Sequence, residues 1–404
     1  MAMTAAAQSV LVTIPGHVPP ERVYDFDYIY DARLIESPHE RMKSLHKEAP
    51  PLFFSPRYGG HWVVTGKAEL ERVACDPELF TSVTRGIPAM AEQPVLIPLT
   101  FDPPRHTQYR APLNAKFTAK GVAPLEHAVR VMAGALIDAV AAQGHCEFLN
   151  DVAEPLPPTL FFKIAGMPTD RLKEFRQLAE DATAAPDPQV RLTAMHQIAA
   201  ILKETVDARI AEPRDDLISE MVTKEFGGQR LTPDEILNYS VLLFLGGLET
   251  VVNSLCFTAR YLALQPELQA ELRADPSRIP LVMEEMLRLH GIAIAVRRTT
   301  RDTELDGVAI KKDDMLMLLL PAVNYDPAAF ENAESMCPGR KEALATFNMG
   351  PHRCIGANLA RLELKVFFEE WLKRIPDFRL DPAHPPKFFG GLNLAVRSLN
   401  LVWG

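Results

Sequence analysis

The stretch Phe347-Asn348-Met349-Gly350-Pro351-His352-Arg353-Cys354-Ile355-Gly356 decides the fold, because it places one cysteine in a turn between glycines, directly ahead of a helical pattern. Gly350 and Gly356 allow backbone turns closed to other residues, and Gly356 also lets a flat object lie against the chain. The residues that follow keep roughly helical apolar spacing up to the breaker Pro376. Cys354 is therefore expected just before a helix N-terminus, where the dipole and free N–H groups lower the pKa of a thiol and make its thiolate a good soft metal ligand.

The spacing Phe-x-x-Gly-x-His-x-Cys-x-Gly resembles the haem-binding signature of the cytochrome P-450 family. The resemblance implies haem b as cofactor, with Cys354 as the proximal thiolate on its iron, a ligand that favours O–O cleavage. It also implies a mainly α fold, a triangular helical domain with a small β-rich region. The alternative for an isolated cysteine is a buried structural residue. Two further matches to the family, given below, argue against that alternative.

Composition narrows the possible classes. The chain has 404 residues, 47% of them hydrophobic, which is enough for a core that encloses a large cofactor. A formal net charge of -9, without a basic stripe or tail, argues against nucleic-acid binding. Five cysteines without a C-x-x-C pair fit neither a disulfide framework nor a zinc site, and the absence of C-x-x-C-H argues that haem is held without covalent attachment.

The beginning of the sequence shows no targeting pattern. Residues 1–20 lack a basic region followed by an apolar run, so neither a signal peptide nor a membrane anchor is expected. We therefore expect a cytoplasmic monomer with one cytochrome P-450 domain over residues 1–404, of which residues 1–20 form an irregular arm.

Periodicity predicts most of the remaining elements. Helices are expected over residues 40–47, 122–142, 156–164, 169–184, 190–211 and 232–265, and strands over 61–66, 293–299 and 315–322. Residues 390–403 have the pattern of a hairpin, and residues 84–100 that of a loop. In the family this loop covers the substrate.

A second stretch of interest begins after two prolines at a helix start. It carries His106 and Arg110 four residues apart, hence on one helix face. The resemblance implies that this pair holds a haem propionate, for which the guanidinium fork is well suited; the alternative is a solvated helix face. By position Arg297 resembles the family's second propionate-binding arginine, with His352 reaching the same carboxylate. Ala295 stands where the camphor hydroxylase branch has Asp, so local hydrogen bonding should differ there.

The region over residues 232–265 is long and apolar on nearly every face. Thr232 and Glu235 form a capping box at its start. A membrane span is the obvious alternative, but Glu249, Asn253 and Arg260 leave no uninterrupted apolar run of the required length. A helix buried in a large core fits better.

This helix contains Gly246-Gly247-Leu248-Glu249-Thr250, in which two glycines and a charged residue each carry a cost. Sequences tolerate such costs chiefly where they serve a function, although a structural kink is the alternative. The segment resembles the family's oxygen-activation motif. By that resemblance the small residues, Gly246 among them, open a groove for O2, Thr250 hydrogen-bonds the bound oxygen, and Glu249, where the camphor branch has Asp, links the pocket to solvent protons.

The third match is the family's Glu-x-x-Arg, present as Glu285 and Arg288. Side chains three residues apart on a helix meet, so a surface ion pair is the alternative. The resemblance instead implies a structural pair behind the haem, joined by Arg340. The segment before Arg340 departs from the usual form, with Ala333 and Met336 in place of Pro and Phe.

The resemblance covers essentially the whole chain and is strongest to the camphor hydroxylase branch. It implies a dry substrate cavity lined, besides Gly246 and Thr250, by Leu96, Leu242, Leu245, Ala293, Leu392 and Asn393. Pro94 stands where a Tyr of that branch binds the camphor ketone, and losing this donor should relax selection for a ketone. We therefore expect hydroxylation of a small apolar terpenoid or norisoprenoid, such as an ionone, with camphor hydroxylation as the alternative.

Electrons must come from another protein, because the chain has neither a Gly-rich dinucleotide fingerprint nor a cysteine cluster for an iron–sulfur centre. The resemblance implies a [2Fe-2S] ferredoxin reduced by an NADH-dependent reductase. It would dock on the Cys354 side, where a basic patch could be formed by Arg105, Lys116, Arg340, Arg353 and Arg361. A peroxide-driven peroxygenase and a non-catalytic haem sensor remain alternatives. The intact segment 246–250 argues against both, because neither needs a proton relay to O2.

Overall fold

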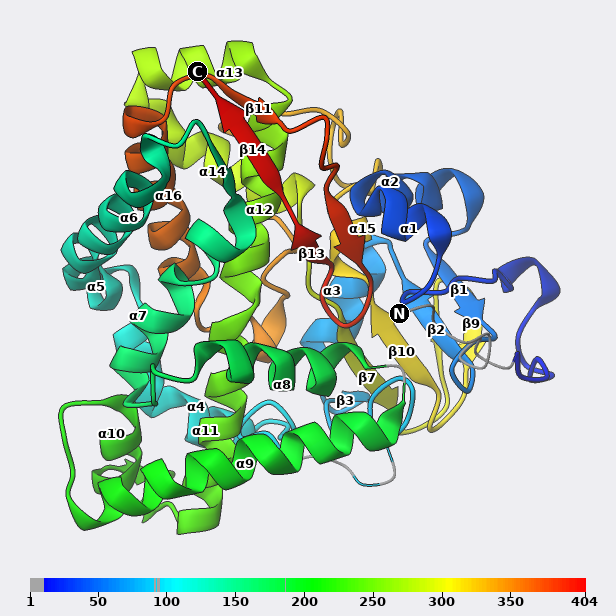
Figure 1. Ribbon diagram of the computed structural model, residues 1–404. Coiled ribbons are helices and arrows are strands. Elements are labelled where there is room, and N and C mark those ends of the chain that lie inside the picture. The colour runs from blue at the N-terminus through cyan, green and yellow to red at the C-terminus, as the bar shows by residue number, and fades with distance from the viewer. Residues whose placement is uncertain (1–10, 91, 93–94, 186) are drawn as a thin grey trace.

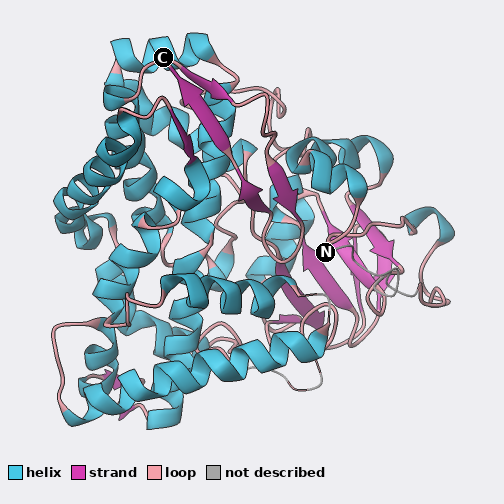
Figure 2. Ribbon diagram, in the orientation of Figure 1, coloured by secondary structure: helices cyan, strands magenta, loops and turns pink. Residues whose placement is uncertain are grey.

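A computed structural model describes residues 11–90, 92, 95–185 and 187–404. Helices make up most of the molecule, and most of the strands lie together on one side of it (Figure 1; Figure 2). The helices are α1 (Ala32–Glu36), α2 (Pro38–Glu48), α3 (Lys67–Cys75), α4 (Arg105–Asn114), α5 (Ala119–Val122), α6 (Glu126–Ala141), α7 (Leu156–Ala165), α8 (Leu172–Ala184), α9 (Pro188–Ala211), α10 (Leu217–Thr223), α11 (Pro233–Leu248), α12 (Thr250–Ala263), α13 (Pro266–Ala274), α14 (Ile279–Leu289), α15 (Leu320–Val323) and α16 (Ala357–Arg374). The mainly helical fold with a small β-rich region is thereby confirmed.

The largest sheet combines segments far apart in the chain, in the order β1-β2-β10-β7-β3. The strands are β1 (Leu52–Ser55), β2 (His61–Val64), β3 (Phe80–Thr81), β4 (His145–Glu147), β5 (Glu225–Phe226), β6 (Gln229–Arg230), β7 (Ala295–Thr299), β8 (Thr303–Leu305), β9 (Val308–Ile310), β10 (Met315–Leu318), β11 (Phe378–Leu380), β12 (Lys387–Phe389), β13 (Ala395–Ser398) and β14 (Asn400–Trp403). β10 pairs with β2 in parallel and with β7 antiparallel. β7, which carries Arg297, is therefore held between β10 and β3.

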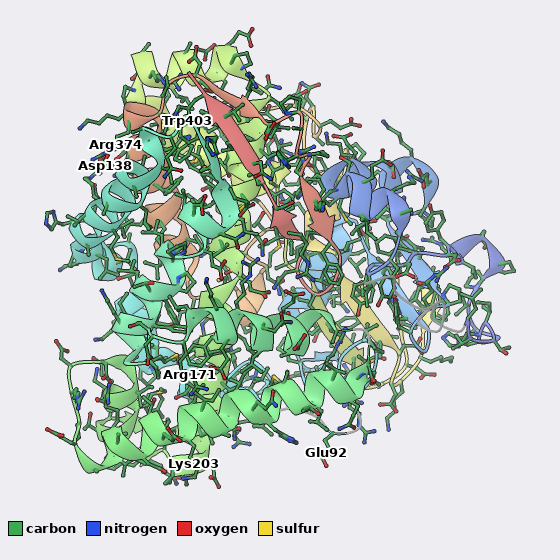
Figure 3. All side chains as sticks on the ribbon, in the orientation of Figure 1. Glu92, Asp138, Arg171, Lys203, Arg374 and Trp403 are labelled. Atoms are coloured by element: carbon green, nitrogen blue, oxygen red, sulfur yellow. The ribbon has the colours of Figure 1, made fainter. Side chains whose placement is uncertain are left out.

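Most predicted helices are present, namely α2, α6, α7, α8, α9 and α16. α4 begins directly after the two prolines, as expected. Residues 11–19 contain no helix or strand, and the rest of the expected N-terminal arm lies outside the described residues apart from residue 20, where a short 3-10 turn begins. α16 packs along α6, and at their ends Arg374 reaches Asp138 at 2.9 Å (Figure 3).

The apolar region over residues 232–265 folds as two helices rather than one. The capping box is present: the Thr232 hydroxyl accepts from the Glu235 N–H, and the Glu235 carboxylate accepts from the Thr232 N–H. α11 ends at Leu248 and α12 starts at Thr250, with Glu249 between them. Figure 1 shows the two helices running through the middle of the molecule.

Glu249, Asn253 and Arg260 interrupt the apolar run of this region, but its length and composition alone do not exclude a membrane span. Residues Pro233–Ala263 are long and apolar enough to cross a bilayer. More than half of the apolar window is buried inside the molecule, as in the core helix of a soluble protein, so the composition is weak evidence for a span.

Two predictions for the last third of the chain are wrong. The strand expected over residues 315–322 stops at Leu318, and Leu320–Val323 form the short helix α15. The expected hairpin over residues 390–403 does not form, because β13 pairs with β12 while β14 pairs with β11 and β4. Alternation indicates a strand but not its partner, and β12 lies just before the stretch considered.

Candidate active site

A cavity of about 350 Å³ lies between α11 and α12 on one side and the Cys354 turn with α16 on the other. α4 and the segment before β7 also contribute to its wall. It contains predicted site residues from distant parts of the sequence: His106, Arg110, Leu242, Gly246, Thr250, Ala293, His352 and Cys354. Its other walls are largely apolar, with Leu99, Leu113, Phe117, Phe161, Leu243, Leu287, Ile292, Ile294, Leu320 and Leu359 among them.

Cys354 lies in the predicted place, between a 3-10 turn (Gly350–His352) and the N-terminus of α16. Its N–H donates to the Phe347 carbonyl at 2.8 Å. Gly350 has φ +64°, and a Cβ there would lie 2.3 Å from the Ala74 carbonyl oxygen, so both conformation and contact require glycine. A Cβ on Gly356 would meet only the Cys354 sulfur, at 3.8 Å, so the space over this turn is open.

The prediction that the helix start lowers the thiol pKa is wrong in its net direction. The Cys354 side chain is exposed to the cavity, yet its position deep within the molecule desolvates the thiol and raises its pKa above the usual 9.0. The Gly356 N–H and the charges of Arg110, Arg353 and Arg361 act in the opposite direction without outweighing this desolvation. A metal ion bound at the sulfur would supply the missing positive charge, since coordination deprotonates a thiol outright.

Three basic side chains, His106, Arg110 and His352, line one edge of the cavity, and Arg297 lies buried beside them without lining it. The rings of His106 and His352 lie with centroids 4.2 Å apart, and Ser82 Oγ lies 3.0 Å from His352 Nε2. Arg110 donates to the Arg353 carbonyl, and Arg297 Nη1 donates to the carbonyl of Val296 at 2.8 Å. His106 Nδ1 and Arg297 Nη2 are buried without a hydrogen-bond partner.

The electrostatics of this cluster indicate an anionic ligand. Burial, and then Arg110, lower the pKa of His106 to about 4, and burial lowers the pKa of Arg297 to about 10. Asp102, whose charge favours protonation of both, has its carboxylate bonded to the Thr81 hydroxyl and to the Ser82 N–H.

Unpaired buried donors are costly, and a carboxylate would satisfy them. With an open-faced cysteine turn opposite an apolar wall, the residues present fit a haem whose propionates reach this edge.

The junction of α11 and α12 forms the wall opposite Cys354. A Cβ on Gly246 would have nothing within 4 Å, so this glycine leaves open space. A Cβ on Gly247 would lie 2.1 Å from Phe161, so the second glycine serves packing. The Thr250 hydroxyl donates to the Gly246 carbonyl at 3.2 Å, and both residues line the cavity.

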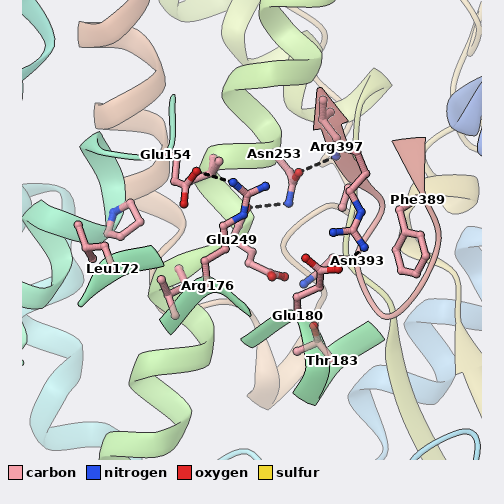
Figure 4. A pocket seen from close by; sticks show the side chains of 15 residues that line it. Glu154, Leu172, Arg176, Glu180, Thr183, Glu249, Asn253, Phe389, Asn393 and Arg397 are labelled. Atoms are coloured by element: carbon pink, nitrogen blue, oxygen red, sulfur yellow. Dashed lines mark hydrogen bonds and ion pairs between the residues drawn. The ribbon is translucent and has the colours of Figure 1, made fainter. Parts of the chain in front are cut away.

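Some expected residues lie elsewhere. The cavity is lined by residues 242, 243, 246 and 247 of α11 and by residue 250 at the start of α12, whereas Leu245 and Glu249, four apart, do not line it. Leu245 packs into an apolar cluster, and Glu249 lines a separate small cavity with Asn393 (Figure 4). Leu392 packs in the core, and its carbonyl accepts from Ile294 N–H at 2.9 Å. Leu96 packs against an apolar cluster and does not line the cavity, whereas Pro98 and Leu99 of the same loop do.

Glu285 and Arg288 form a buried cluster rather than a surface pair. Their side chains are 4% and 1% exposed and are joined by two hydrogen bonds of 2.9 Å. Arg340 donates to Glu285 at 3.2 Å, so the structure brings the third expected partner into contact. Arg288 also donates to the carbonyls of Asn324, Ala333 and Ser335.

The expected basic patch is weaker than its residue types suggest. Lys116 pairs with Glu220 at 2.6 Å, Arg361 with Glu284 at 2.6 Å, and Arg105 with Glu235 at 3.9 Å. Arg340 is 7% exposed and belongs to the Glu285 cluster, so it cannot contribute to a surface patch. Spacing in sequence gives no information on such long-range ion pairs.

Sequence reasoning missed Glu363, on α16. It is 1% exposed, lines the cavity, and has one buried oxygen without a partner. Burial raises its pKa to about 8. A carboxylate among the apolar residues of the helix predicted after Cys354 was the available signal.

Comparisons with known proteins agree with this geometry. The profile of the cytochrome P450 family matches residues 189–396. A probable cytochrome P450 127A1 of Sinorhizobium fredii is 33% identical over 402 residues, covering 96% of this chain and 97% of that protein. A steroid C26-monooxygenase of Mycobacterium tuberculosis is 33% identical over 331 residues, covering 78% and 88%. The crystal structure of CYP101J2 superimposes with a TM-score of 0.88 at 34% identity, covering 97% of this chain and 100% of that one.

Proposed function

This chain belongs to the cytochrome P450 family, and from that premise we propose that it hydroxylates a small apolar terpenoid or norisoprenoid, ionone-like, with O2 and electrons from a [2Fe-2S] ferredoxin. It is a monooxygenase with haem b as cofactor. The substrate class and the electron donor are the proposed part. The observation that carries the proposal is the apolar wall of the cavity around Gly246 and Thr250.

The residues divide the work as follows. Haem, when bound through Cys354, supplies the oxygen-activating chemistry, for which a thiolate ligand is suited. His106, Arg110, Arg297 and His352 would hold its propionates.

Other residues around the cavity would orient the substrate or take part in proton transfer. Leu242 and Ala293, with Ile294 and Leu99, exclude water and hold an apolar substrate by shape. Thr250 places a hydroxyl in the cavity, and Glu249 holds a proton on the far side of the same helix junction.

The substrate is tested by titrating the ferric holoenzyme with an ionone and with camphor while recording the haem absorption. A full shift from low to high spin with the ionone, and little with camphor, supports the proposal. A full shift with camphor alone contradicts it. Pro94, on which the argument against camphor depends, lies outside the described residues, so this titration is its direct test.

The electron source is tested by product formation. NADH-driven hydroxylation that requires a [2Fe-2S] ferredoxin and its reductase supports the monooxygenase cycle proposed here. Turnover supported by peroxide and not by ferredoxin identifies a peroxygenase, and binding of ligand without any turnover identifies a sensor. With the ferredoxin system active, Thr250→Ala should still consume NADH but release peroxide in place of product.

We further propose one domain over residues 1–404, a monomer, and a cytoplasmic location. The extent of the family relatives supports the first: the chain spans 97% of the curated protein from Sinorhizobium fredii. Size-exclusion chromatography and cell fractionation test the other two.

A further inference from the structure

The helix α4, which carries His106 and Arg110, is held only weakly by apolar packing. Of its ten residues only His106 and Leu113 are buried, so little hydrophobic burial fixes its orientation. Pro112 lies inside the helix, where a proline lacks an N–H for the carbonyl four residues earlier and favours a bend. The direction in which Arg110 points therefore depends on contacts between α4 and other elements.

The helix α11, which lies beside α4 (Figure 1), supplies such contacts from two residues. The Tyr239 hydroxyl donates to the main-chain carbonyl of Tyr109 at 2.9 Å. In the other direction, the Tyr109 hydroxyl donates to the Glu235 carboxylate at 2.5 Å. Glu235 also accepts from the Thr232 N–H in the capping box, which fixes this carboxylate at the start of α11. Two hydrogen bonds thus join the helices, from positions on α11 that lie one turn apart.

The protonation states of both groups on α11 suit these bonds. Tyr239 is 2% exposed and lines the large cavity, and burial raises the pKa of its hydroxyl above the usual 10, so it remains a donor at neutral pH. Burial alone would raise the pKa of Glu235, but hydrogen bonds from Tyr109 and Thr232 lower it, so this group remains an ionised acceptor.

The residue after Tyr109 is Arg110, whose guanidinium donates to the Arg353 carbonyl beside Cys354. Consecutive residues of α4 are therefore bound to two different walls of the cavity, the Tyr109 main chain to α11 and the Arg110 side chain to the cysteine turn. His106 and Arg110 lie four residues apart on one helix face, so any rotation of α4 about its axis would displace both together.

We propose that Tyr239 is a positioning residue for the haem: its hydroxyl, bound to the Tyr109 carbonyl, fixes the rotation of α4 at which His106 and Arg110 face the cavity and would hold the propionates. A phenylalanine would fill the same space without this bond, so the hydroxyl rather than the ring carries the role. The inference depends on haem as the cofactor, but not on the substrate or the electron donor proposed above.

The test is transfer of haem from the ferric holoenzyme to excess apomyoglobin, followed by absorption. We expect Tyr239→Phe to speed the loss of haem about fivefold, the effect of one ordinary buried hydrogen bond. In the Arg110→Gln protein the charge-assisted contact is already gone, so adding Tyr239→Phe should change the rate by about twofold or less. A role in general stability alone would give the same factor in both backgrounds.

Two control variants separate this hydroxyl from buried tyrosines in general. Tyr325 is 3% exposed, and its hydroxyl also donates to a main-chain carbonyl, that of Leu289. Tyr325→Phe should therefore lower stability in urea but leave the rate of haem loss unchanged. Tyr109→Phe keeps the Tyr239 bond to the main chain, so it should speed haem loss less than Tyr239→Phe does.

A wild-type rate of haem loss in Tyr239→Phe overturns the inference, and so does an equal factor with and without Arg110. Faster loss from Tyr109→Phe than from Tyr239→Phe also contradicts it, because the side-chain bond to Glu235 would then be what holds α4. These rates are recorded without turnover, so the inference can fail while the proposed hydroxylation of an ionone-like substrate stands, and the reverse.

Discussion

Replacing Glu363 by Gln should stabilise the protein, by an amount that depends on pH. Glu363 is 1% exposed and its pKa is raised from the usual 4.5 to about 8 by burial. At pH 7 the folded protein therefore holds this group protonated, whereas the unfolded chain releases the proton. Each pH unit between the two pKa values costs about 1.4 kcal/mol of stability.

The expected gain follows from these two values. Below pH 4.5 both states bind the proton, and the variant and wild type should differ only by a constant. At pH 7 the wild type carries a penalty of roughly 3 kcal/mol, which levels off near 5 kcal/mol above pH 8. Gln does not titrate, so the free energy of unfolding of the variant should exceed that of wild type by a growing margin as pH rises from 5 to 8.

The assay is thermal unfolding of the holoenzyme across this pH range, followed by circular dichroism. Glu370→Gln is the control on the same helix, two turns further on. Glu370 is also buried, 4% exposed, but it accepts from Arg130 at 2.6 Å and pairs with Arg374, so its loss should destabilise. A difference between Glu363→Gln and wild type that stays constant from pH 5 to pH 8 would refute the assignment of a neutral acid.

Four further predictions concern the walls of the large cavity and the cluster behind it. Gly246→Ala should fold normally, since nothing lies within 4 Å of the added methyl group, but should weaken ionone binding several-fold in the spin-state titration. Gly247→Ala should lower the melting temperature by about 2–4 °C, because its methyl group would lie 2.1 Å from Phe161. Arg297→Gln should speed the loss of haem to apomyoglobin, and an unchanged rate would contradict its place at the propionates. Arg288→Met should cost about 3–5 kcal/mol in urea unfolding, because its buried carboxylate partner is left with less compensation.

The sequence predicted best what short spacing controls. The Cys354 turn, the capping box at Thr232, and the pairing of His106 with Arg110 each depend on residues within one or two helical turns, so their geometry follows from local rules. The resemblance then allowed residues from distant segments to be assigned to one site, and the structure brings His352 and Cys354 together with α4.

The sequence predictions failed where the outcome depends on contacts between distant segments or on the direction in which a side chain points. Leu245 is as apolar as its neighbours on α11, but it lies one residue before Gly246 and faces away from the cavity. Residues 390–403 do contain strands, as predicted, but these strands pair with other strands and not with each other. The pKa of Cys354 depends on how strongly desolvation of the thiol opposes the pKa-lowering effect of the helix start. The ion-pair partners of Lys116 and Arg361 come from distant segments that no local pattern connects.

The buried guanidinium of Arg288 has a consequence for how this chain can diverge. It binds the main-chain carbonyls of Asn324, Ala333 and Ser335, in a stretch between α15 and the cysteine turn that contains no helix or strand. A carbonyl oxygen is offered by every residue type, so these bonds are indifferent to the side chains in between. The single donor Arg288 can thus hold the path of this segment whatever side chains it carries, so replacements such as Ala333 and Met336 need not change the course of the chain.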